Sequence, residues 1–159
     1  MAFATGDGIR VFGTKDSLDS TSASIATLSF SIATDVVSPW TNDDDAPEAS
    51  FFLVATFATS TNIAGSAITL FARLMNYDAS NNDMEIPSDD NPVIMLGNFN
   101  IPAAVTSLQR MPLSNGIVPL PGAETSADYE FYIRNGSPQT MSAGWVLYVT
   151  PVGIGPQPA

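Results

Sequence analysis

Hydrophobic and polar side chains alternate along much of the chain with a period of two residues, which is the pattern of strands with one buried face. The alternation is clear in residues 24–32, where one face would hold Ala26, Leu28, Phe30 and Ile32. It returns in residues 128–134 and in residues 145–150. Each of these three segments is predicted to be a half-buried strand.

The other apolar segments alternate less clearly. Residues 51–59 (FFLVATFAT) are apolar on both faces, so they are predicted to lie at the centre of a sheet or against a partner subunit. Residues 67–77 would allow a helix on propensity alone, but their β-branched and aromatic side chains favour a strand. Residues 93–101 and 105–112 are shorter strand candidates, and a proline close to the end of each suits an edge or a bend.

Short strands separated by Gly, Pro and Asn turns, with no convincing long helix, predict an all-β chain. We expect a single antiparallel β-sandwich, with the jelly roll as the favoured form. Residues 1–21 are predicted to be an extended N-terminal arm or an edge strand, and residues 22–151 the sandwich domain. Residues 152–159, rich in Gly and Pro, are predicted to be a short C-terminal tail.

Charge narrows the classes of partner. The chain of 159 residues fits one domain, and its net charge is −11, from 16 acidic and 5 basic residues. The basic residues are scattered, whereas nucleic-acid binding needs clustered cations, so nucleic acid and anionic membranes are not expected partners. Residues 1–13 lack the basic stretch and apolar core of a signal peptide, so we expect folding in the cytoplasm.

The residue types needed for most catalytic sites are missing. The chain has no His and no Cys, which removes Ser-His and Cys-His nucleophile pairs and the usual zinc sites. The single lysine, Lys15, lies outside any phosphate-binding glycine pattern. Only carboxylates remain as catalysts, and nothing in the sequence pairs them across a groove. We therefore assign no catalytic, cofactor-binding or metal-binding residue, and we do not expect an enzyme.

Two acidic loops and two tryptophans leave alternatives open. Residues 43–45 and 89–90 are aspartates that could bind Ca²⁺, but without EF-hand spacing a solvated turn is the favoured interpretation. Trp145 lies on the apolar face of its strand and is predicted to be buried. Trp40 follows a proline in a loop, and the sequence favours equally a place under that loop and an intermolecular contact.

The C-terminal third carries a family resemblance. Residues 129–135 (YEFYIRN) and 142–151 (SAGWVLYVTP) resemble the last two strands of jelly-roll capsid decoration proteins, or cement proteins, encoded among the head genes of tailed bacteriophages. The resemblance implies a structural virion protein on the outer capsid, often a trimer at three-fold positions. Its partners would be the major capsid protein and its own copies, and no catalytic residues come with the family.

Candidate interface residues follow from these expectations. The N-terminal arm is expected to reach a neighbouring subunit as a strap, and residues 51–59 are expected to form a subunit surface. With Trp40 added, the candidate interface residues are Ile9, Val11, Phe12, Trp40, Phe51, Leu53 and Phe57. The alternative is a carbohydrate-binding jelly-roll module with exposed aromatic side chains, for which Tyr77, Tyr132 and Tyr148 are candidates. A small enzyme working with carboxylates is a third, less favoured interpretation.

Overall fold

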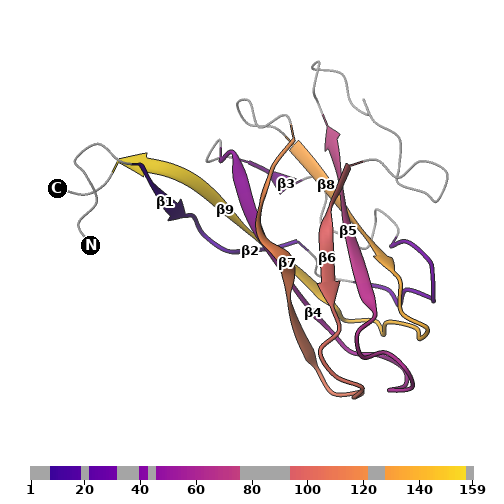
Figure 1. The fold of residues 1–159 in the computed structure, drawn as a ribbon. Coiled ribbons are helices and arrows are strands. Elements are labelled where there is room, and N and C mark those ends of the chain that lie inside the picture. The colour runs from indigo at the N-terminus through magenta and orange to yellow at the C-terminus, as the bar shows by residue number, and fades with distance from the viewer. Residues whose placement is uncertain are drawn as a thin grey trace, which may run out of the picture.

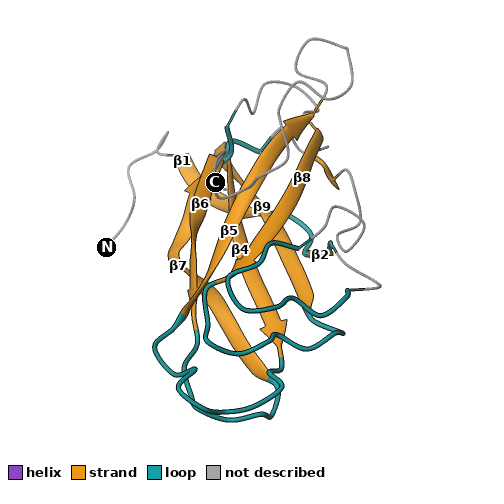
Figure 2. Cartoon of the chain, turned by 90° about the vertical axis from the view of Figure 1, so that its right-hand side faces the viewer, coloured by secondary structure: helices purple, strands orange, loops and turns teal. Residues whose placement is uncertain are grey.

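The computed structural model describes residues 8–18, 22–31, 40–42, 46–75, 94–121 and 128–156. These ranges contain strands, turns and irregular segments (Figures 1 and 2). The strands are β1 (Gly8–Phe12), β2 (Asp16–Ser17), β3 (Trp40–Thr41), β4 (Glu48–Ala55), β5 (Ala67–Met75), β6 (Ile94–Asn100), β7 (Gln109–Pro119), β8 (Asp128–Asn135) and β9 (Val146–Pro156). Within these ranges no helix is long and apolar enough to cross a membrane.

The strands pair in a nested order, and every ladder is antiparallel. β1 and β2 pair with β9, β3 with β8, β4 with β7, and β5 with β6. β9 also pairs with β4, and β8 with β5, which gives the spatial order β1-β9-β4-β7-β6-β5-β8-β3. In the described ladders the two halves of this order join at the pair Phe99–Leu113, between β6 and β7. The chain is therefore an all-β, antiparallel sandwich with jelly-roll topology, as the sequence predicted.

The core lies between the two halves and follows from the alternation of side chains. In β4 every second residue is buried, beginning at Ala49 and continuing through Phe51 and Leu53. From the opposite half, Phe131 of β8 meets Phe51 with ring centroids 5.0 Å apart in an edge-to-face arrangement. Full burial of a side chain as large as that of Phe51 or Leu53 contributes about 1.5–3 kcal/mol to stability.

Residues 24–31 do not form the regular strand that their alternation predicts. Leu28 has a φ of 59° and a side chain that is 56% exposed, and the backbone N–H of Ser29 donates to the carbonyl of Ala26 at 3.2 Å. This turn breaks the alternation. The segment instead runs along β8, where the N–H of Leu28 donates to the carbonyl of Asn135 at 2.7 Å. The alternation does not predict this conformation, because a few separate backbone hydrogen bonds to β8 hold the segment in place of a continuous ladder.

Two predicted boundaries also differ. β9 continues to Pro156 and pairs with β1, so residues 152–156 are strand rather than tail. β7 begins at Gln109 and passes through Pro112, which is paired with Phe52 beside a register shift in the β4–β7 ladder. A proline has no N–H to give to a ladder, and an irregularity is where such a residue is tolerated.

Buried hydrogen bonds fix the turn after β8. Asn135 is fully buried, and its Nδ2 donates to the carbonyls of Ile25 at 3.0 Å and Gln139 at 2.8 Å. Its Oδ1 accepts hydrogen bonds from the N–H and the hydroxyl of Ser137, at 3.0 and 2.7 Å. A Cβ on Gly136 would lie 2.6 Å from the carbonyl oxygen of Ala67. The Asn-Gly pair is thus required here for a tertiary reason, in addition to its preference for turns.

Two tyrosines of β8 are buried on opposite faces of the strand. Tyr129 donates its hydroxyl to the carbonyl of Pro121 at 2.8 Å. Tyr132 donates to Glu130 Oε2 at 2.7 Å, and the same oxygen accepts a bond from Arg73 Nη1 at 3.0 Å. Burial raises the pKa of Tyr129 to about 12. Burial also raises the pKa of Tyr132 to about 12, where the hydrogen bond with Glu130 adds to the effect and Arg73 opposes it.

These tyrosines predict a loss of stability in alkali. A raised pKa in the fold means that the folded state favours the neutral phenol, so its contribution is complete below the ordinary value of 10.0 and is lost as the pH rises through about 12. The free energy of unfolding should fall by about 2–3 kcal/mol per tyrosine. Urea unfolding at a series of pH values measures this fall, and Tyr132→Phe should reduce it. Tyrosinate absorbance that develops fully near pH 10 while the protein remains folded would contradict the prediction.

Candidate binding surface

A two-stranded ribbon extends away from the sandwich. β4 pairs with β9 only as far as the pair Glu48–Val152, and beyond that point β9 has β1 as its only neighbour among the described strands. Gly13 extends the contact, because its N–H donates to the carbonyl of Pro151 at 2.8 Å. We call residues 8–13 and 151–156 the ribbon. In Figure 1 it points to the left of the other strands.

The ribbon concentrates exposed apolar side chains. Paired residues on neighbouring strands share a face, which places Phe12 and Ile154 on one face and Val11 on the other. Phe12 is 59% exposed, Ile154 70% and Val11 47%. In the described part of the chain the other large apolar side chains with comparable exposure are separate from the ribbon, namely Leu28, Met95, Val105 and Leu108. Clustered exposed apolar side chains are a mark of interaction surfaces.

Charge on the ribbon is low. Its one charged residue is Arg10, whose Nε lies 3.1 Å from Glu48 Oε2, and a second bond joins Nη2 to Oε1 at 3.3 Å. β9 lies between β1 and β4, so this pair bridges across it and helps to hold the ribbon against the sandwich. In a chain with a net charge of −11, the ribbon is a nearly neutral, apolar surface.

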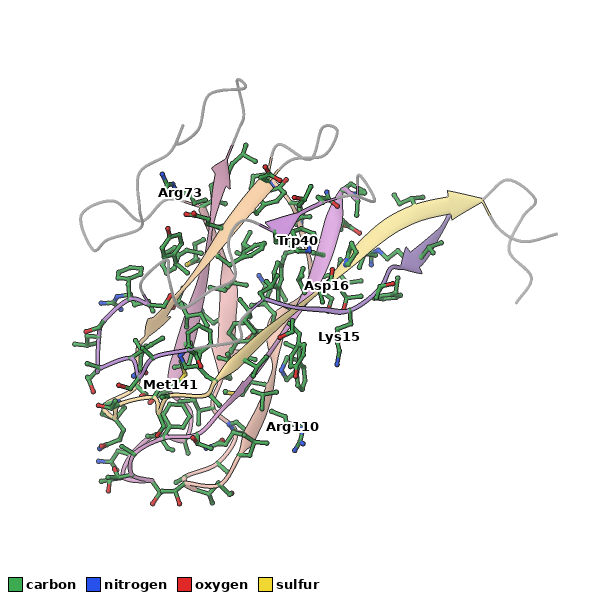
Figure 3. All side chains as sticks on the ribbon, turned by 180° about the vertical axis from the view of Figure 1, so that it is seen from behind. Lys15, Asp16, Trp40, Arg73, Arg110 and Met141 are labelled. Carbon is green, nitrogen blue, oxygen red and sulfur yellow. The ribbon has the colours of Figure 1, made fainter. Side chains whose placement is uncertain are left out.

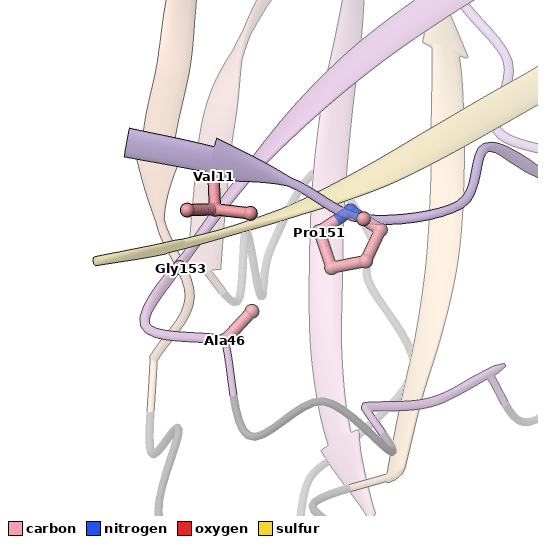
Figure 4. Close-up of a pocket in the computed structure, with 5 residues that line it drawn as sticks. Val11, Ala46, Pro151 and Gly153 are labelled. Atoms are coloured by element: carbon pink, nitrogen blue, oxygen red, sulfur yellow. The ribbon is translucent and has the colours of Figure 1, made fainter. Parts of the chain in front are cut away.

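A small pocket lies where the ribbon leaves the sandwich (Figure 4). Its volume is about 250 Å³, and it is lined by Val11, Gly13, Ala46, Pro151 and Gly153. A Cβ on Gly153 would have open space around it, whereas a Cβ on Gly155 would lie 2.9 Å from Val11 Cγ2. Gly155 therefore permits close packing of the two strands, while Gly153 leaves the pocket empty on that side.

The predicted arm residues lie in the ribbon. Val11 and Phe12 are exposed there, and Ile9 belongs to β1, although its side chain lies outside the described part. Their role in an interface stays a prediction. The sequence indicated an apolar arm, but it did not indicate the pocket or the partnership with Ile154.

The second group of predicted interface residues lies in the core. Phe51, Leu53 and Phe57 are 1%, 0% and 3% exposed, so they are not available as an outer surface, which corrects that expectation. β4 lies between β9 and β7, one of its faces is buried in the core, and Phe52 and Val54 on its other face are half-buried. The sequence left a central strand and a subunit surface as alternatives, and the structure shows the central strand.

Both tryptophans pack within the chain. Trp40 is 9% exposed, its ring centroid is 6.0 Å from those of Tyr129 and Phe131, and its Nε1 donates to Asp16 Oδ2 at 3.3 Å. Trp40 is the first residue of β3, and Figure 3 labels it close to Asp16. Of the two alternatives for Trp40, packing within the chain is the one observed. Trp145 is 1% exposed, so its predicted burial is confirmed.

The candidate glycan and metal sites gain no support from the described residues. Tyr132 is buried, Tyr148 is half-buried with Lys15 Nζ 4.3 Å from its ring centroid, and Tyr77 lies outside the described part. The aspartates at 43–45 and 89–90 also lie outside it. Among the residues that are described, no group of three or more His, Cys, Asp or Glu side chains could hold a metal ion.

No family model, curated protein or solved structure matches the chain. The resemblance to phage decoration proteins therefore rests only on the sequence of residues 129–135, in β8, and of residues 142–151, which include the first half of β9. The fold and the ribbon define a coarser class, a jelly roll with a projecting apolar ribbon. Function has to be argued from that ribbon, because a jelly roll by itself specifies none.

Proposed function

We propose that this protein decorates and stabilises the head of a tailed bacteriophage. It binds the outer surface of the major capsid protein as a trimer, and the ribbon provides the contact. The observation that carries the proposal is the ribbon itself, an apolar and nearly uncharged strand pair that extends away from the other strands. The resemblance in residues 129–135 and 142–151 supplies the identity of the partner.

The ribbon has physical properties suited to such a contact. A stable protein interface buries about 800 Å² on each partner, and a projecting ribbon offers two faces and an edge to that area. The ladder with β9 holds β1 in an extended conformation before binding, so less conformational entropy is lost than for a disordered arm. Among the described strands, β1 lies at the end of the order, and a strand of the partner could pair with the backbone groups along its outer edge.

Substituting the exposed apolar residues of the ribbon tests the proposal. The double variant Phe12→Ser with Ile154→Ser should bind at least about tenfold more weakly, because burying each of these side chains contributes about 1.5–3 kcal/mol and 1.4 kcal/mol is a factor of ten. The measurement is co-sedimentation with empty capsids, assembled from the major capsid protein encoded in the same phage genome, over a range of concentrations.

A matched control uses apolar residues outside the ribbon. Met95 and Leu108 are 61% and 48% exposed, so the double variant Met95→Ser with Leu108→Ser removes a similar exposed apolar surface. This control should co-sediment like the unmodified protein. Failure of the unmodified protein to bind capsids would refute the proposed function. Equal weakening by both double variants would refute the role of the ribbon.

A further inference from the structure

The sequence contains two Asn-Gly pairs, Asn115 with Gly116 in β7 and Asn135 with Gly136 at the end of β8. Asparagine is a chemically labile residue, and it is most reactive before glycine. The backbone nitrogen of the glycine can attack the side-chain amide carbon of the asparagine, because glycine has no side chain to hinder the approach. The attack needs a side chain and a backbone that are free to move. The two pairs differ sharply in this respect.

The second pair is held against reaction. In a fully buried site, Asn135 Nδ2 donates to the carbonyls of Ile25 at 3.0 Å and Gln139 at 2.8 Å. The N–H of Gly136, whose nitrogen would make the attack, donates to the carbonyl of Ala67 at 3.1 Å. A Cβ on Gly136 would lie 2.6 Å from the same carbonyl oxygen, so the backbone has no room to turn there. Ring formation would require all of these buried hydrogen bonds to break.

The first pair lies in a bulge of β7. The ladder with β4 is interrupted between Pro112 and Ile117 of β7, whereas on β4 the interruption spans only Phe51. Neither Asn115 nor Gly116 belongs to a residue pair of the described ladders. Because a bulge leaves its extra residues outside the ladder, these two residues can change conformation while the ladder on either side remains paired.

The surroundings of Asn115 are open as well. Asn115 and Gly116 are both exposed, and within the described part of the chain the amide of Asn115 has no hydrogen-bond partner. Its Nδ2 lies beside β6, 3.4 Å from the position that a Cβ on Gly97 would take. Gly116 has a φ of 71°, a left-handed conformation that glycine adopts readily, and a Cβ there would have open space around it. Water therefore reaches the side chain and the backbone of this pair.

We infer that Asn115 is a site of spontaneous deamidation in the folded protein, whereas Asn135 is protected by the fold. The Gly116 nitrogen bonds to Cγ of Asn115, the bond between Cγ and Nδ2 breaks, and the proton of the Gly116 nitrogen leaves with Nδ2 as ammonia. Water then opens the succinimide ring. Addition of water at Cγ gives aspartate, and addition at the main-chain carbonyl carbon gives isoaspartate, in which the backbone is one carbon longer.

The modification changes the surface where the two halves of the sandwich meet. Leu113, two residues before Asn115, pairs with Phe99 at the join between β6 and β7. Either product replaces a neutral amide with a carboxylate beside Gly97, and it makes the net charge one unit more negative than −11. An ageing sample therefore becomes a mixture of folded chains that differ in charge and in backbone length at this surface.

Trypsin digestion tests the inference on the unmodified chain. Cleavage after Arg110 and Arg134 releases the fragments 111–134 and 135–159, which contain one Asn-Gly pair each and no other asparagine. The folded protein is incubated at mildly alkaline pH, and samples taken over time are digested and analysed by chromatography with mass spectrometry. Fragment 111–134 should gain two products, aspartate and isoaspartate, while fragment 135–159 should stay as it is in a fresh sample digested in parallel.

The same chain unfolded in guanidinium chloride is the matched control. Without the fold both pairs are open, so both fragments should be modified at similar rates, and the incubation of the folded protein continues until this has happened. Equal modification of the two fragments in the folded protein would overturn the inference, and so would an unchanged fragment 111–134. Aspartate without isoaspartate would show direct hydrolysis and exclude attack by the Gly116 nitrogen. No capsid enters the experiment, so its result is independent of the proposed function.

Discussion

Replacing Trp145 with alanine is expected to lower the free energy of unfolding by about 3–5 kcal/mol, a large share of the ~5–15 kcal/mol typical of a domain. The indole is 1% exposed and belongs to the core cluster immediately before β9. Its Nε1 donates to the carbonyl of Ala23 at 2.8 Å, so the substitution also removes this hydrogen bond. Urea unfolding followed by circular dichroism measures the change.

Two further variants serve as controls: one separates the loss of the aromatic ring from the loss of the hydrogen bond, and the other removes an aromatic ring that is exposed. Trp145→Phe keeps an aromatic ring but loses the donor, so it should cost clearly less than the alanine variant. Phe12→Ala removes an aromatic ring that is 59% exposed and should change the free energy of unfolding by about 0.5 kcal/mol or less. A cost below about 1 kcal/mol for Trp145→Ala would contradict the buried position of the indole.

Asn135→Ala should have an effect of similar size although it removes little apolar surface. The amide donates to the carbonyls of Ile25 and Gln139 and accepts two bonds from Ser137, all in a fully buried site. Leaving a buried polar group unsatisfied costs about 1–3 kcal/mol, and several groups lose their partner at once. We expect a loss of about 3–5 kcal/mol, measured by urea unfolding.

Asn115→Ala is the matched control for this prediction. Asn115 is an exposed residue of β7, so its substitution should stay within about 0.5 kcal/mol of the unmodified protein. Asn135→Asp should be destabilising as well, because it keeps the acceptor for Ser137 but directs a carboxylate at the carbonyls of Ile25 and Gln139. Equal stability of Asn135→Ala and Asn115→Ala would refute the role of the buried amide.

The strands with a clean alternation could be predicted from the sequence, because alternation reports directly which side chains share a face. Residues 128–135 and most of 145–150 are strand as expected, and so are 67–75 and 94–100. Residues 24–31 show the limit of this reasoning. The same alternation is present there, but the left-handed conformation of Leu28 breaks it, and this conformation depends on bonds to a strand more than a hundred residues away.

The candidate site was only partly predictable for a related reason. An apolar N-terminal arm can be recognised in the sequence, and Val11 and Phe12 are exposed in the ribbon. Which apolar residues remain exposed depends on how the strands pack, so the sequence of residues 51–59 is compatible both with a central strand and with a subunit surface. The pocket depends on the point at which β9 loses contact with β4. Gly153 and Gly155 in an apolar segment were the available signal, since glycine in a strand often marks a close approach.

The position of β9 between β1 and β4 has a consequence for synthesis. Translation proceeds from the N-terminus, so β4 is synthesised long before β9, which pairs with one of its edges. β1 likewise has no β9 to pair with until residues 152–156 leave the ribosome. The ladder between β1 and β9 closes a loop that contains most of the sequence, and long loops close slowly. A nascent or truncated chain therefore exposes the unpaired, apolar edge of β4 to its neighbours on a polysome. Chaperone occupancy during translation, rather than the stability of the finished domain, would then limit its yield.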